Sequence, residues 1–137
     1  MLSKRAKYGL KAMKYLAEQK DNVPVLISEI SEKENIPFKF LQSILLSLKK
    51  EGFLESKKGK GGGYFLKIPA GQINMASLYR TLDGPIALVP CVSLNYYQKC
   101  DDCEDEYTCC VNRLMIQVRD KTLKLLEKET LADLIKK

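Results

Sequence analysis

The chain has 137 residues, 45% of them hydrophobic, which is enough for one small domain and an appendage. No apolar run is long enough to cross a bilayer, and lysines interrupt the N-terminal segment that would have to serve as a secretion signal, so we expect a cytoplasmic protein with no membrane partner. Residues 1–70 hold 14 Lys/Arg against 7 Asp/Glu, whereas residues 71–137 hold 9 against 10. This asymmetry favours a nucleic-acid-binding module joined to a different unit, although a generic lysine-rich surface would give the same balance.

The first half of the chain predicts three helices. Ser3 can cap a helix that runs to about Gln19, with apolar residues at three- and four-residue spacing. A short helix follows at residues 27–34. Pro37 suits the first turn of a third helix that extends to about Glu51. The buried side of this third helix is expected to carry five apolar residues, namely Phe40, Leu41, Ile44, Leu45 and Leu48.

Two short strands with a glycine-rich connection come next. Residues 53–57 and 64–68 flank the sequence KGKGGG at 58–63, which predicts a β-hairpin with a basic tip. Three helices followed by a hairpin are the order of a winged helix-turn-helix, so we predict a mainly α fold with residues 1–70 as a DNA-binding domain. A phosphate-binding P-loop is excluded because no strand–GxxxxGK[ST]–helix order is present. The alternative is a solvated hairpin with a flexible tip.

The second half predicts a connecting region and a long C-terminal helix. Residues 71–110 contain a helix at about 73–82 and then a loop that holds every cysteine. Residues 111–137 contain a long helix, after which Thr130 can cap a last turn. We expect the long helix to be a dimerisation helix that packs on a second copy through its apolar stripe, formed by Val111, Leu114, Met115, Val118, Thr122, Leu125 and Leu126.

The recognition helix of a helix-turn-helix places its N-terminal residues in the major groove. Here Gln42 can pair with adenine, and Lys39 can reach guanine or a phosphate. The lysines and glycines of the wing fit contacts to the DNA backbone or the minor groove. The predicted DNA-binding residues are Ser3, Lys4, Arg5, Tyr8, Phe38, Lys39, Gln42, Ser43, Lys57, Lys58, Lys60 and Gly61.

All five cysteines lie between residues 91 and 110 with the spacing C-x8-C-x2-C-x5-C-C, and the chain has no histidine. Without a secretion signal, clustered cysteines are typical of metal or redox sites rather than structural disulfides. Four thiolates accept either zinc or an iron–sulfur cluster, and the sequence does not separate the two. Alternatively, the five are incidental thiols in an acidic loop. The predicted metal ligands are Cys91, Cys100, Cys103 and Cys109, and Cys110 is left over as an odd residue or a buried core thiol.

Four segments together resemble the Rrf-type winged-helix regulators, which include iron–sulfur, nitric-oxide and cysteine-metabolism regulators. They are SKRAKYGLKAMKYLA, ISEISEKENIPFKFLQSILLSLKKEGFLESKKGKGGGYFL, LYRTLDGPI and the cysteine segment. The resemblance implies a homodimer with crossed C-terminal helices that binds a near-palindromic operator in double-stranded DNA. In cluster-bearing members it implies three cysteines before the dimer helix and a variable fourth ligand. Cys91, Cys103 and Cys109 match that pattern best, and the alternative has Cys100 in the middle place.

Two departures from this pattern affect the fourth ligand. Asn112 stands where the iron–sulfur regulator has a histidine, and Lys7 stands where the nitric-oxide sensor uses an acidic residue. Our hypothesis is that Cys100 serves instead, giving all-cysteine ligation of a [2Fe-2S] or [4Fe-4S] cluster within one subunit. Some family members carry no cluster.

The sequence therefore predicts a DNA-binding transcription regulator that senses iron–sulfur or redox state, and not an enzyme. One alternative is a winged-helix repressor without a cluster, in which the cysteines hold structural zinc, act as thiol-redox groups or leave the sensing to a partner. A redox enzyme or iron–sulfur carrier has little support, because no nucleotide motif and no acid–base constellation stands out.

Overall fold

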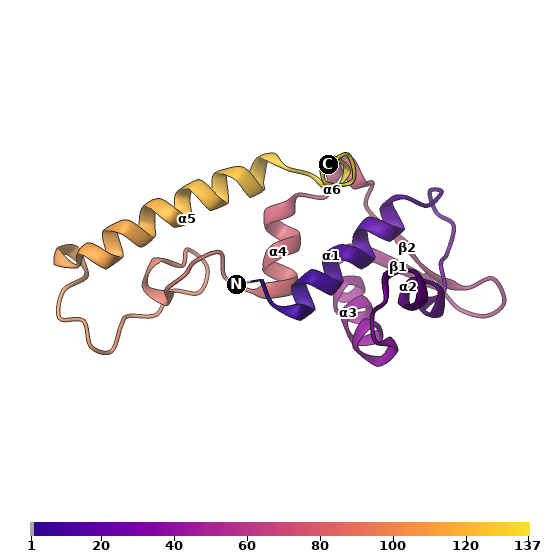
Figure 1. Ribbon diagram of the computed structural model, residues 1–137, viewed down its shortest axis with the longest axis horizontal. Coiled ribbons are helices and arrows are strands. Elements are labelled where there is room, and N and C mark those ends of the chain that lie inside the picture. The colour runs from indigo at the N-terminus through magenta and orange to yellow at the C-terminus, as the bar shows by residue number, and fades with distance from the viewer. Residues whose placement is uncertain (1) are drawn as a thin grey trace.

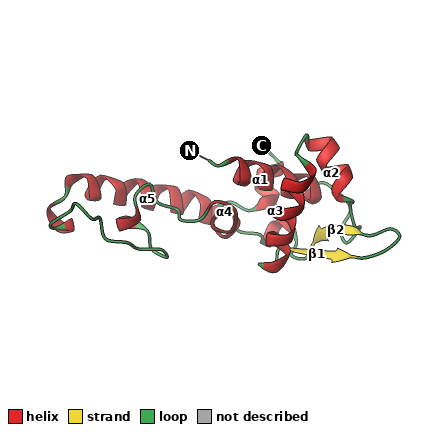
Figure 2. Cartoon of the chain, turned by 90° about the horizontal axis from the view of Figure 1, so that it is seen from below, coloured by secondary structure: helices red, strands yellow, loops and turns green. Residues whose placement is uncertain are grey.

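The computed structural model describes residues 2–137 and divides into a body and an arm (Figure 1). The body contains α1 to α4, the two strands and α6, while α5 and the cysteine-bearing loop extend away from it (Figure 2). Among these described residues, no helix combines the length and the apolar character needed to span a membrane. The elements are α1 (Lys4–Ala17), α2 (Ile27–Glu34), α3 (Phe38–Lys50), β1 (Leu54–Lys57), β2 (Gly63–Leu66), η1 (Ala70–Gln72), α4 (Met75–Asp83), η2 (Pro90–Val92), η3 (Glu106–Thr108), α5 (Cys110–Lys128) and α6 (Leu131–Ile135).

Local capping sets the boundaries of the first helices. The Ser3 hydroxyl accepts a hydrogen bond from the backbone N–H of Ala6 at 3.1 Å, as the predicted N-cap requires. Asn35 adopts a left-handed conformation with φ of 54° and ends α2. Pro37 was expected inside the first turn of α3 but is the N-cap residue itself, because its extended backbone precedes the first helical residue.

The core of the body lies between α1, α3 and α4. The predicted buried side of α3 is confirmed for Leu41, Ile44, Leu45 and Leu48, which are inaccessible to solvent. The prediction for Phe40 is wrong, since this side chain is 40% exposed. It lies on the flank of α3 beside α1, where its ring meets Tyr8 edge to face with centroids 5.6 Å apart.

The wing is a two-stranded antiparallel hairpin whose base is extended by the loop before α2. Leu54 pairs with Leu66, and Lys57 pairs with Gly63. Tyr64 exchanges both of its backbone hydrogen bonds with Val25 at 2.8 Å, which adds a bridge from a distant segment. Each strand is one residue shorter than predicted, because β1 begins one residue later, and β2 begins one residue earlier but ends two residues earlier.

The C-terminal segment returns to the body after α5. Thr130 pairs with Asn74 in an isolated β-bridge, and the Asn74 amide donates to the carbonyl of Glu127 at 2.8 Å. Leu131, the first residue of α6, has 0% exposure and belongs to the same core as α1 and α4. The predicted Thr130 cap is confirmed by a capping box with Asp133. The C-terminal end of α5 is thereby attached to the body.

Gly63 lies where the wing meets the body, and we expect the stability of the fold to be sensitive to a side chain at this position. Its φ of 141° disfavours any side chain, and a Cβ at this position would overlap the Val25 backbone. Gly63→Ala should therefore lower the free energy of unfolding by at least about 2 kcal/mol in urea titrations. The matched control is Gly61→Ala, which has a φ of 73° but open space around it. It should cost only about 1 kcal/mol, and equal losses would contradict the clash.

Candidate DNA interface and thiol cleft

The N-terminal half of α3 presents an outward polar face. Phe38, Lys39, Gln42 and Ser43 are all exposed there, while Leu41 on the opposite side is buried. The helix contacts β1 and lies beside the hairpin (Figure 2). A helix face that is polar, exposed and adjacent to a wing has the geometry that major-groove readout requires.

The N-terminal turn of α1 is tied to the flank of α3. The Arg5 guanidinium donates to the Ser47 hydroxyl at 2.7 Å, and Tyr8 packs on Phe40. Ser47 and Phe40 are seven residues apart, which is two helical turns on one flank of α3. Arg5 and Tyr8 were predicted as DNA contacts. In the structure both side chains also contact α3 and help to fix its position. Ser3 is occupied as the α1 cap, and Lys4 is exposed.

The hairpin carries a dense group of positive charges. Lys57, Lys58, Lys60 and Gly61 are exposed along β1 and the tip, and residues 56–63 contain no acidic side chain. The Lys49 ammonium donates to the Ser56 hydroxyl at 2.7 Å, which attaches the wing to the end of α3. A basic, glycine-rich projection of this kind fits a phosphate backbone.

The four predicted ligand cysteines line one open cleft of about 1060 Å³ at the far end of the arm. Cys91 comes from η2, Cys100 and Cys103 come from the following loop, and Cys109 is the N-cap residue of α5. Cys110 does not line this cleft, and the expectation of a buried core thiol there is wrong for the described chain, because this residue is exposed.

Hydrogen bonds through Asn112 join Cys91 and Cys109 into a linked set. Asn112 donates to the Cys109 sulfur through its backbone N–H at 3.4 Å and to the Cys91 sulfur through its side-chain amide at 3.3 Å. Burial raises the pKa of Cys103, and the negative charge of Cys109 raises it further. The Cys100 thiol donates to the Asp102 carboxylate at 2.7 Å, and the Cys100 carbonyl accepts from the Cys103 backbone N–H at 3.3 Å.

The donor set fits an iron–sulfur cluster or zinc, because four thiols surround one cleft. The set is not preassembled, since residues 2–137 contain no group of three or more cysteine or acidic side chains placed to hold a metal ion. The thiols would therefore have to move closer together when a cluster or a metal ion binds. The hydrogen bond to Asp102 raises the pKa of Cys100 and lowers that of Asp102, so the free loop favours the protonated thiol.

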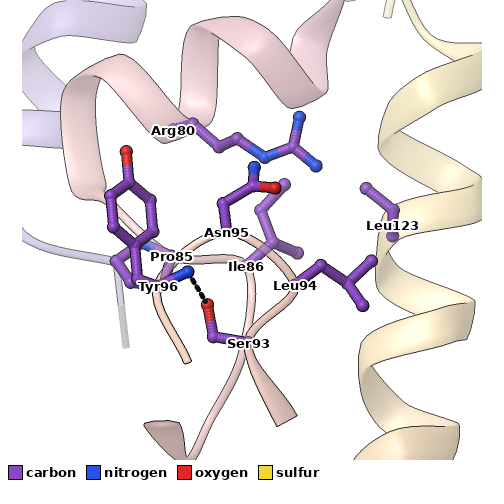
Figure 3. A pocket seen from close by; sticks show the side chains of 8 residues that line it. All are labelled: Arg80, Pro85, Ile86, Ser93, Leu94, Asn95, Tyr96 and Leu123. Carbon is purple, nitrogen blue, oxygen red and sulfur yellow. Dashed lines mark hydrogen bonds between the residues drawn. The ribbon is translucent and has the colours of Figure 1, made fainter. Parts of the chain in front are cut away.

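A second cavity lies under the loop between α4 and α5 (Figure 3). Arg80, Ser93, Tyr96 and Leu123 are among its lining residues, and the Ser93 hydroxyl accepts from the Tyr96 backbone N–H at 3.0 Å. Its volume of about 10 Å³ is barely enough for one water molecule. This cavity is a packing feature of the loop and not a ligand site.

A winged helix with an exposed recognition face and a basic wing defines a DNA-binding transcription regulator. Residues 2–137 match the Rrf2 family, described as "Iron-dependent Transcriptional regulator", and the chain belongs to that family. An rrf2-like HTH-type transcriptional regulator of Rhodobacter capsulatus is 38% identical, covering 98% of this chain and 92% of its own length.

Solved structures confirm the predicted fold class. CymR, the global cysteine regulator of B. subtilis, superposes with a TM-score of 0.80 at 27% identity, covering 99% of this chain and 96% of its own. IscR of T. potens gives a TM-score of 0.77 at 25% identity, with 99% and 86% covered. Family membership also confirms the prediction of a transcription regulator rather than an enzyme.

The contact between Cys100 and Asp102 gives a measurable reactivity. The thiolate is the nucleophile in alkylation, so a raised pKa makes Cys100 slow at neutral pH and faster only as the pH rises. Asp102→Asn should accelerate its alkylation by iodoacetamide at pH 7.5 in metal-free protein, measured by peptide mass spectrometry. Asp101→Asn, which removes a neighbouring charge but no hydrogen bond to the thiol, is the control. Equal rates in the two variants would contradict the assigned contact.

Proposed function

We propose that this Rrf2-family regulator binds a near-palindromic operator as a homodimer and senses iron–sulfur or redox state through Cys91, Cys103 and Cys109, with Cys100 as fourth ligand. The observation that carries the proposal is the gathering of these four thiols around one cleft at the start of α5. A [2Fe-2S] or [4Fe-4S] cluster held in this cleft would change its oxidation state in response to oxidants, and its stability would depend on the iron supply.

The contacts within the cleft support Cys91 and Cys109 as the core of the ligand set. Asn112 connects the sulfurs of Cys91 and Cys109, and Cys103 lines the same cleft. Cys100 and Cys103 belong to one exposed loop, where the Cys103 backbone N–H donates to the Cys100 carbonyl and the Cys100 thiol donates to Asp102. This arrangement supports Cys91 and Cys109 as the fixed ligands, to which the loop adds Cys103 and Cys100.

The exposed apolar face of α5 supports the homodimer. Their spacing places Val111, Leu114 and Leu125 on one side of α5, and each is more than half exposed. An apolar stripe on a helix that projects from its own body is stabilised when another surface covers it. A second copy with the same stripe supplies that surface through a two-fold axis, and the axis would also place two recognition helices on one duplex.

The connection from the cleft to the DNA runs along α5. Cys109 caps one end of this helix, and beyond the other end Leu131 is buried in the body. A change in the spacing of the thiols acts on the cap, and the helix transmits a displacement to the bridge between Asn74 and Thr130. The expected mechanism is a population shift between arrangements of the two winged helices with high and low affinity for the operator.

One observation favours a second function for the same cleft. Cys103 and Cys109 line the same cleft, and thiols that share a cleft also suit a repressor without a cluster, in which they undergo thiol-redox chemistry or hold zinc. In that case the DNA-binding half of the proposal is unchanged. Metal and sulfide content separates the two functions.

For the DNA interface we expect Gln42→Ala to relax sequence choice, at about 1–3 kcal/mol for the lost base contact. Lys60→Ala should instead weaken all sequences equally and reduce the slope of affinity against salt by about one. Fluorescence anisotropy with a duplex selected from a random library, and with a scrambled duplex, measures both effects. Lys136→Ala, which removes an exposed charge beyond α6, should change neither. Unaltered sequence preference in Gln42→Ala would contradict the recognition face.

For the cleft we expect anaerobically purified protein to be brown and to contain iron and sulfide. Cys109→Ser should lose most of the iron, because this thiol is part of the linked set, whereas Cys110→Ser should keep it. Cys100→Ala tests the fourth ligand, since an unchanged spectrum would place that ligand elsewhere. A colourless wild-type protein that holds only zinc, or no metal after anaerobic reconstitution, would contradict cluster sensing.

A further inference from the structure

We infer that Asn112 is a positioning residue of the thiol centre, which holds Cys91 in the cleft and donates a hydrogen bond to its sulfur. The hydrogen bond stands on geometry alone, and its redox consequence rests on the proposed function. Asn112 is 8% exposed and, with Ser93, is one of two buried polar side chains among the described residues. A buried amide is costly unless it is hydrogen-bonded, so its partner has to be explained.

That partner is a sulfur and not a backbone group. The side-chain amide of Asn112 donates to Cys91 Sγ at 3.3 Å, and its backbone N–H donates to Cys109 Sγ at 3.4 Å. One residue in the first turn of α5 therefore connects thiols from two separate segments. Because Cys109 is fixed as the helix cap, the Cys91 sulfur acquires a defined place relative to α5.

A second contact from the same helix face reinforces this placement. The Arg119 guanidinium donates to the carbonyl of Val92 at 2.8 Å, one residue beyond Cys91. Arg119 follows Asn112 by seven residues, so both side chains leave α5 on the same side. The η2 turn is thus attached to α5 at two points, and Cys91 moves with the helix. Cys100 has no such link to α5, because its thiol bonds to Asp102 in its own loop.

The hydrogen bond also has an electrostatic effect. An N–H that points at a sulfur stabilises negative charge on it, and negative charge on ligand sulfurs increases when a cluster is reduced. Asn112 should therefore raise the reduction potential of a cluster bound through Cys91. A residue with a purely structural role would affect folding but would not move the potential in a direction set by its hydrogen-bonding capacity.

The first experiment uses reduced, metal-free protein and needs no cluster. Nitrogen-15 NMR follows hydrogen exchange of the Asn112 side-chain amide, assigned in the wild-type protein through its correlation with the Asn112 backbone signals. Cys91→Ala should accelerate this exchange roughly fivefold, the factor that one ordinary net hydrogen bond represents. Cys110→Ala is the matched control, because this cysteine is exposed and lies outside the cleft. Exchange that is equally fast in wild type and Cys91→Ala overturns the inference.

The second experiment uses anaerobically reconstituted protein. In a potentiometric titration, dithionite supplies the electron and ferricyanide removes it. Asn112→Leu should make the midpoint potential more negative, and Asn112→Asp should shift it further because a negative charge replaces the donor. Gln117→Leu, an exposed amide on another side of α5, should leave it unchanged. An unshifted or more positive midpoint in both Asn112 variants overturns the redox part.

The two experiments separate failure of the inference from failure of the proposed function. Wild-type protein that takes up no cluster overturns cluster sensing, and the exchange measurement alone then decides whether Asn112 holds Cys91. Where a substitution of Asn112 prevents folding, the exchange comparison still decides, since it keeps Asn112 and changes only Cys91 or Cys110.

Discussion

The rest of the structure depends on one constraint: after α5 the chain returns to the body and packs into its core. Leu131 is fully buried, and its backbone N–H donates to the Ile73 carbonyl at 3.0 Å. The backbone N–H of Met75 donates to Glu129 at the same distance, just before α4 begins. Exposing a leucine of this kind and breaking the bridge would cost several kilocalories per mole. The body therefore holds one end of α5, and the thiol cleft lies at the other.

A single helix serves two surfaces because its faces are separate. The stripe that contains Val111 and Val118 is about 100° around the axis from the direction of Asn112 and Arg119. The first face is apolar and partly open to solvent, whereas the second is hydrogen-bonded to η2. Among the stripe residues, Val111 also lines the thiol cleft, so dimer contacts and thiol contacts act on α5 largely, but not entirely, through different side chains.

Periodicity and capping signals predicted most of the fold from sequence. The expected helices agree with α1 to α5 within about two residues, and the Ser3 cap is confirmed. The errors lie where a local pattern meets a distant element. The helical period placed Phe40 near the buried face, but contact with Tyr8 decides its position on the flank. No local signal could show that Val25 would pair with the wing, because the two are almost forty residues apart.

In the candidate sites, too, the sequence predicted some features, whereas others depend on contacts that only the structure shows. Cysteine spacing predicted a common site, and four thiols do line one cleft. Spacing could not show how Cys100 and Cys103 differ, because that difference depends on contacts such as the hydrogen bond from the Cys100 thiol to Asp102. It also could not show Asn112 as a sulfur donor, since the sequence presents it only as a polar residue near the start of a helix. The DNA-binding residues remain predictions whose exposure the structure reports.

The four thiols are not held equally, and this difference predicts which part of the proposed sensor moves when the metal core is lost. Asp101, Asp102, Glu104, Asp105 and Glu106 crowd the loop that carries Cys100 and Cys103. Their negative charge opposes thiolates unless a metal core compensates, so loss of that core favours release of the loop. Cys91 and Cys109 stay with α5 through Asn112, and α5 stays with the body through Leu131. In the proposed sensor, release of the acidic loop would therefore act on the cap of α5, the helix whose other end is held in the body by Leu131.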